Sequence, residues 1–218
     1  MVETSRKMPR SVWVGVLLLG TFLGLALLLS AVSLKRHRPA LPILGHVADF
    51  TLTNQDGQAI TLDNLTNHVW VADIIFTRCP GPCPRMTGQM KSLQDALPQA
   101  SRARIVTMTT DPEFDSPAVL KKYGEHFNAD FNRWNFLTGT KDEIAGLAGS
   151  SLKLSAVPVN PAERTNNADL FIHTTIFVLV DRHAELRGVF ETGGDDVDWT
   201  NAVQPKLLAA ISQLENEP

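Results

Sequence analysis

The fold is decided by one stretch of the sequence, residues 69–84, which reads VWVADIIFTRCPGPCP. Its first half, Val69–Phe76, is a mostly apolar run bounded by turn residues, which predicts a central strand buried on both faces. Its second half carries Cys79 and Cys83 in a proline-rich turn, directly before a helix that we expect over Met86–Leu97. Open α/β sheets bind ligands at the carboxyl ends of their strands, so we expect the functional site at this junction.

The rest of the chain predicts strands that alternate with helices. Asp49–Thr53 and Ile60–Leu62 flank the turn Asn54–Gly57, and this pattern predicts a hairpin. The remaining expected elements are a strand at Ile105–Met108, a helix opening at Asp115–Pro117, a short helix at Lys141–Leu147, a loop at Val157–Ala168, a hairpin of Thr174–Val180 with Glu185–Glu191, and a closing helix at Pro205–Leu214. This order predicts an α/β fold, with a mixed sheet flanked by helices.

The amino-terminal part predicts a membrane anchor. Residues 12–34 form a run of 23 residues without an ionisable side chain, and a helix of that length spans a hydrocarbon core of about 30 Å. A cleaved signal peptide, ending near Ala31-Val32-Ser33, is the alternative, but a signal core has only about 7–15 apolar residues. We therefore expect a cytoplasmic amino terminus at residues 1–11, a transmembrane anchor at 12–34, a linker at 35–45 and one domain at 46–218.

Charge excludes one class of partner. The chain has a net charge of −3, but six of its 20 basic residues and one of its 23 acidic residues lie at or before Arg38. The remainder therefore carries 14 basic and 22 acidic side chains, a net charge of −8. Nucleic-acid binding needs a basic face, so no nucleic-acid partner is expected, whereas cations and basic protein surfaces suit an acidic domain.

The two cysteines predict a single local site. They are the only cysteines of the chain and lie four positions apart, which is typical of a redox pair, a metal site or both. The amino terminus of the expected helix offers free N–H groups and a partial positive charge, which should lower the pKa of the cysteines. Thiolates bind soft metals and also exchange disulfides, so the residue types leave both functions open.

Three segments together resemble the Sco/SenC family, the copper chaperones of cytochrome c oxidase assembly. The first reads Phe-Thr-x-Cys-Pro-x-x-Cys-Pro over residues 76–84. The second is Asp-Pro-x-x-Asp-x-Pro over residues 111–117, and the third places His173 after Phe171-Ile172, ahead of a hydrophobic strand. The resemblance implies a thioredoxin-like fold for residues 46–218 and copper ligation by Cys79, Cys83 and His173.

The implied ligand set suits copper. Two thiolates and one imidazole form a soft, three-coordinate set for Cu(I), and an added ligand would accommodate Cu(II), whereas zinc prefers four ligands. Asp111 ends a strand near the cysteine turn. We give equal weight to two roles for it: a residue that contacts and tunes the metal ligands without binding the metal, or a helix-start or turn residue. We expect Asp115 to cap the following helix.

The resemblance implies a metallochaperone that gives copper to the copper-receiving subunit of cytochrome c oxidase. The alternative is an extracytoplasmic thiol-disulfide oxidoreductase that reduces the cysteines of its target, so whether the protein is an enzyme stays open. Another copper donor or a thiol reductant would be a further partner. Because the cytoplasm offers little free copper and an oxidising compartment lets the same pair cycle to a disulfide, we expect a single-pass protein of the bacterial inner membrane, with its domain facing the periplasm or the cell exterior.

Overall fold

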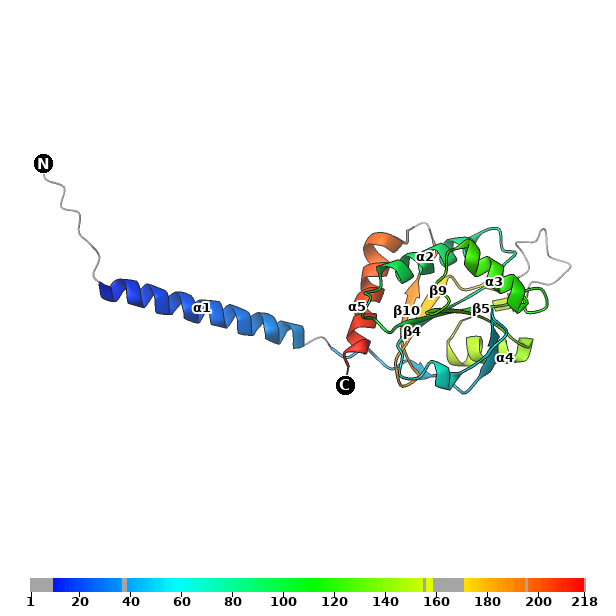
Figure 1. Ribbon diagram of the computed structural model, residues 1–218, viewed down its shortest axis with the longest axis horizontal. Coiled ribbons are helices and arrows are strands. Elements are labelled where there is room, and N and C mark those ends of the chain that lie inside the picture. The colour runs from blue at the N-terminus through cyan, green and yellow to red at the C-terminus, as the bar shows by residue number, and fades with distance from the viewer. Residues whose placement is uncertain (1–9, 37–38, 155, 159–170, 195, 218) are drawn as a thin grey trace, which may run out of the picture. The chain divides into compact units, whose positions relative to one another are not determined.

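The computed structural model describes residues 10–36, 39–154, 156–158, 171–194 and 196–217 (Figure 1). Side chains are described for most of these residues, but not for 10–11, 28, 31–36, 156–158 and 171–173. The chain divides into two units, Met1–Ala40 and Leu41–Pro218, and each is considered by itself.

The first unit contains the helix α1, Arg10–Arg36. Its described large apolar side chains are exposed, from 41% for Val12 to 71% for Phe22. Within the part of the chain that the structure describes, no helix has the length and hydropathy that a membrane span requires. The transmembrane anchor predicted at residues 12–34 is therefore not confirmed and stays a prediction.

The second unit is built on a mixed sheet of eight strands in the order β1-β10-β9-β4-β5-β6-β2-β3. The neighbours β4, β5 and β6 are parallel, and the other neighbours are antiparallel. The strands are β1 (Gly45–His46), β2 (Thr51–Asn54), β3 (Ala59–Thr61), β4 (Trp70–Ile75), β5 (Arg104–Thr109), β6 (Trp134–Thr138), β9 (Ile176–Val180) and β10 (Glu185–Glu191). Separately, β7 (Ala156–Pro158) pairs with β8 (Phe171–His173).

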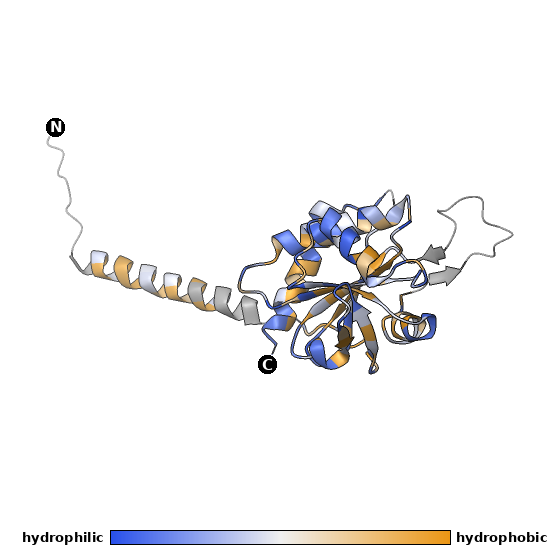
Figure 2. Ribbon diagram, turned by 45° about the vertical axis from the view of Figure 1, so that its right-hand side comes forward, coloured by the Kyte–Doolittle hydropathy of each residue, from blue (hydrophilic) through white to orange (hydrophobic). Residues whose placement is uncertain are grey.

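Helices cover both faces of the sheet (Figure 1). Successive side chains of a strand point to opposite faces. On β4, Val71 therefore packs toward α2 (Pro82–Ala96), α3 (Pro117–His126) and α5 (Gln204–Glu215), whereas Ala72 and Ile74 pack toward α4 (Lys141–Ala145). Figure 2 shows hydrophobic residues on the strands and hydrophilic stretches on the outer helices. The predicted α/β fold with a mixed, helix-flanked sheet is confirmed.

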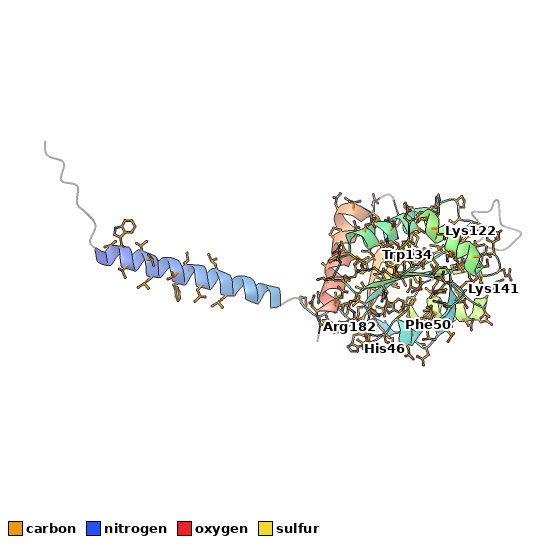
Figure 3. All side chains as sticks on the ribbon, viewed as in Figure 1. His46, Phe50, Lys122, Trp134, Lys141 and Arg182 are labelled. Carbon is orange, nitrogen blue, oxygen red and sulfur yellow. The ribbon has the colours of Figure 1, made fainter. Side chains whose placement is uncertain are left out.

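Three predictions about elements need correction. The strand β6 was missed, because its five residues contain the polar Asn135 and only pairing with β5 and burial of Trp134 identify it. Figure 3 shows Trp134 inside the domain, where its ring stacks on Phe136 with centroids 4.9 Å apart. The helix α2 begins at Pro82 rather than Met86, because proline suits the first turn of a helix. Gly45, predicted to belong to the linker, already pairs with Leu186.

The parallel pairing of β4 and β5 brings together the two loops that follow them. β4 ends at Ile75 and β5 at Thr109, in register with each other. The Thr110 N–H donates to the Ile75 carbonyl over 2.8 Å and extends this ladder. The cysteine turn and the segment that begins at Asp111 therefore leave the sheet side by side.

Candidate metal or redox site

The two cysteines occupy different positions at the end of β4. Cys79 lies in the turn before the helix, where its N–H donates to the Phe76 carbonyl over 3.2 Å. Cys83 is the second residue of α2. The two cysteines are not joined by a disulfide, 5% of Cys79 and none of Cys83 is exposed, and both pack with Phe76 and Tyr123. The site is therefore a pair of thiols shielded from water.

The electrostatics of Cys83 differ from the prediction. A hydrogen bond between the two cysteine side chains raises the pKa of the Cys83 thiol, and burial and the nearby Asp73 raise it further. The backbone at Phe76 acts in the opposite direction but does not prevail. The prediction that the helix terminus lowers the pKa of both cysteines is therefore wrong for Cys83, because the hydrogen bond with Cys79 and then the loss of hydration both favour the protonated thiol.

Asp115 anchors the cysteine turn to the sheet. Its buried carboxylate accepts hydrogen bonds from the Thr77 N–H over 3.1 Å and from the hydroxyls of Thr77 and Thr109. Burial raises the pKa of Asp115, and the bonds from the two threonines oppose this rise. The prediction that Asp115 caps α3 is wrong, since Ser116 occupies the N-cap position and makes no side-chain capping bond.

Replacing Asp115 by alanine is expected to lower the free energy of unfolding by about 2 kcal/mol, because one buried and two partly buried donors lose their acceptor. Urea unfolding at pH 7 measures the change. Glu113→Ala is the matched control, since Glu113 lies in the same segment but forms only an exposed ion pair with Lys141. An equal, small loss in both variants would show that Asp115 does not hold the turn.

Asp111 lies against the same turn. Its carboxylate Oδ2 is 2.5 Å from Nη2 of Arg78, the residue before Cys79, and only 7% of Asp111 is exposed. The Arg78 guanidinium carbon also lies 4.1 Å from the centre of the Phe114 ring. Asp111 thus closes a turn and contacts the neighbour of a cysteine, so both alternatives weighed for it remain compatible with its position.

Two further residues of the site were missed from the sequence. The Thr87 hydroxyl donates to the Cys83 carbonyl over 2.9 Å and lies 2.9 Å from the Tyr123 hydroxyl. Because Thr87 donates to the carbonyl, the Tyr123 hydroxyl is the donor to Thr87. The spacing of four residues between Cys83 and Thr87 places both on one helix face, and this signal was available in the sequence. The contact of Thr87 with Tyr123 of α3 was not, because it joins two helices.

His173 is the last residue of β8 and pairs with Ala156. Its side chain lies outside the described part of the structure. Among the side chains that are described, no three His, Cys, Asp or Glu residues come together as a metal site. The structure thus brings Cys79, Cys83 and the segment of Asp111 together, while ligation by His173 stays a prediction.

The mixed sheet, with a reduced cysteine pair where a central strand meets a helix, defines a thioredoxin-like thiol protein. The profile of the SCO1/SenC family matches residues 44–207, and the chain belongs to this family. It is 37% identical over 162 residues to the SCO1 protein homolog of Bacillus subtilis, covering 72% of this chain and 81% of that protein.

Solved structures agree with this assignment. BsSco, a member of the Sco family of cytochrome c oxidase assembly proteins in which a disulfide switch was identified, superposes with a TM-score of 0.67. Its sequence is 29% identical, and the match covers 82% of this chain and 99% of BsSco. ScoI of Bradyrhizobium japonicum, solved with copper bound, has a TM-score of 0.63 at 23% identity, covers 78% of this chain and 99% of ScoI, and supports the fold.

Proposed function

We propose that this protein is a copper metallochaperone that binds Cu(I) and Cu(II) through Cys79, Cys83 and His173 and delivers copper to the copper-receiving subunit of cytochrome c oxidase. The observation that carries the proposal is the pair of buried thiols, hydrogen-bonded to each other at the end of β4, in a chain of the SCO1/SenC family.

The described donors fit a soft, monovalent metal. Two thiols already within hydrogen-bond reach of each other need little rearrangement to bind one Cu(I). The turn that carries Cys79 is held by Asp115 through Thr77 and by Asp111 through Arg78. Copper in this site would be cargo, so the turn must hold it firmly and still release it to a partner.

Copper affinity is expected to rise with pH. The raised pKa of Cys83 keeps this thiol protonated across neutral pH, so binding as a thiolate must displace its proton. Between pH 6 and pH 8 the apparent Cu(I) affinity should rise about tenfold per pH unit for each proton displaced. Competition with a Cu(I) chelator of known pH dependence measures the slope, and a flat profile would mean that Cys83 binds no copper as a thiolate.

Replacing His173 by alanine is expected to weaken Cu(II) binding strongly and Cu(I) binding only modestly. Two thiolates suffice to hold Cu(I), whereas Cu(II) prefers an additional nitrogen ligand. Parallel Cu(I) and Cu(II) titrations of the wild type and His173→Ala measure both affinities. The control is His183→Ala, since His183 is exposed in the turn between β9 and β10 and should leave both affinities unchanged.

Two outcomes of these titrations separate the ligand from the function. A wild-type protein that binds neither copper ion tightly would overturn the proposed function. Equal Cu(II) binding by the wild type and His173→Ala would remove His173 from the ligand set and leave the cysteine pair as the site.

A thiol-disulfide oxidoreductase is the second candidate, and the closeness of the two thiols, which are not joined by a disulfide, favours it. In that reaction Cys79 and Cys83 form a disulfide while the target disulfide takes up two electrons and two protons and becomes two thiols. A thiol reductant would then restore the pair. Reductase activity that survives His173→Ala would support this candidate, whereas activity that requires His173 and copper would support the chaperone.

We also propose that residues 12–34 anchor the protein in the bacterial inner membrane, with the domain in the periplasm or outside the cell. The uncharged run of 23 residues between basic flanks supports the anchor. The scarcity of free copper in the cytoplasm, and the disulfide that the pair can form in an oxidising compartment, support the orientation. Protease accessibility of the domain in intact spheroplasts tests it, and a protected domain would contradict it.

A further inference from the structure

The backbone that leads from His173 into β9 is held by the end of β10. Thr175 stands two residues after His173 and directly before β9. Its carbonyl accepts hydrogen bonds from both the N–H and the hydroxyl of Thr192, over 2.8 and 2.9 Å. One carbonyl with two donors from a single residue fixes the position of this backbone relative to β10.

Gly193, the next residue, leaves no room for a side chain. A Cβ atom at this position would lie 2.3 Å from Oγ1, 2.5 Å from Cβ and 2.9 Å from Cγ2 of Thr175. The Cβ atom of Thr175 is attached directly to the backbone, so rotation of the threonine side chain cannot clear the space. The φ angle of Gly193 is not positive, so glycine is needed here for its size rather than its conformational freedom.

A side chain of the cysteine helix reaches the same point. The amide nitrogen of Gln89, in α2, donates to the Thr192 carbonyl over 3.0 Å. Gln89 follows Cys83 by six residues in this helix, about 9 Å along its axis. The buried Oε1 atom of Gln89 has no hydrogen-bond partner among the described residues. A continuous set of contacts therefore links the helix of Cys83, through Gln89, Thr192 and Thr175, to the backbone that carries His173.

We propose that Gln89 and Gly193 are positioning residues that set the distance between the cysteine helix and the His173 segment, and thereby the affinity for Cu(II) relative to Cu(I). The inference rests on the proposed function, because it needs copper bound by both segments. A side chain at position 193 displaces Thr175 and the two residues before it. Loss of the Gln89 amide releases the same strand end from α2.

A purely structural role makes a different prediction. If these contacts only stabilise the fold, their loss lowers the free energy of unfolding and changes the two copper affinities in proportion. A positioning role changes the ratio of the affinities, because Cu(I) depends mainly on the two cysteines while Cu(II) depends strongly on His173 at the right distance.

The test uses the full chain with Gly193→Ala and Gln89→Ala. Two controls on α2 match them in chemistry. Gly88→Ala adds a Cβ that meets nothing within 4 Å, and Gln94→Ala removes a side-chain bond to Asp130, remote from Thr192. Cu(I) affinity is measured by chelator competition, Cu(II) affinity by titration, and Cu(II) geometry by its electron paramagnetic resonance spectrum. Amide exchange at Thr192, whose N–H donates to the Thr175 carbonyl, reports on the strand end without copper.

The expected result is a Cu(II) affinity about tenfold lower in Gly193→Ala and less reduced in Gln89→Ala. Both variants should show an altered Cu(II) spectrum, faster exchange at Thr192 and Cu(I) affinity close to that of the wild type, while both controls match the wild type. If Gly193→Ala does not fold, Gln89→Ala alone decides. An unchanged ratio of the two affinities in a folded variant overturns the inference, whereas a wild type that binds no copper overturns the proposed function instead.

Discussion

Replacement of Cys83 by serine is expected to lower the affinity for Cu(I) at least about a hundredfold. Metal sites with four protein ligands bind with about 10–16 kcal/mol, so one ligand carries on average about 3 kcal/mol, and 1.4 kcal/mol corresponds to a factor of ten. Serine keeps the size of the side chain but offers a hard oxygen instead of a soft sulfur. Competition with a Cu(I) chelator measures the loss.

The fold of the variant needs its own measurement, because Cys83 is fully buried. A serine hydroxyl without a partner there costs about 1–3 kcal/mol, so Cys83→Ala provides a second variant without a polar group. Met90→Leu is the matched control, since Met90 is a buried sulfur-containing residue of the same helix and leucine conserves its volume. Tight Cu(I) binding by a folded Cys83→Ala variant would remove Cys83 from the site.

Replacement of Arg187 by alanine is expected to lower the free energy of unfolding by about 3–5 kcal/mol. Arg187 lies at an irregularity of β10, between Leu186 and Gly188, and is only 7% exposed. Its Nη1 atom is 2.5 Å from Asp181 and 3.2 Å from Glu217, and its Nε and Nη2 atoms donate to the Leu41 carbonyl. One guanidinium therefore joins the β9–β10 turn, the carboxyl-terminal segment and the segment that enters the domain.

The cost of this substitution arises mainly from what it leaves behind. Asp181 is only 2% exposed, and without Arg187 its carboxylate stays buried without a compensating charge. Lys141→Ala is the control, because the pair of Lys141 with Glu113 is exposed and should contribute little to the free energy of unfolding. Figure 3 shows Lys141 at the periphery of the domain. Equal losses in urea unfolding for the two variants would contradict the assigned role of Arg187.

The sequence by itself determined the elements whose signals are local. The apolar run of Val69–Phe76 predicted a strand buried on both faces, and all six residues of β4 are buried. Asp56-Gly57 predicted the turn of the first hairpin, and Gly57 has a φ angle of +76°. Period and turn chemistry act over a few residues, so they can be read without knowledge of the rest of the chain. The position of the cysteine pair at the junction of β4 and α2 could also be read from the local sequence.

Only the tertiary structure decided which distant groups meet at the cysteines. Asp115 bonds to Thr77, and Thr87 contacts Tyr123, in each case across separate elements. The burial that helps to raise the pKa of Cys83 also comes from separate elements that pack together. Sequence spacing carries no information on such contacts, because sheet order and helix packing set them. Asp115 shows the difference. Its place before Pro117 suggested a helix cap, but the parallel pairing of β4 with β5 offers its carboxylate three donors, the Thr77 N–H and the hydroxyls of Thr77 and Thr109. A buried carboxylate is stable only with such partners.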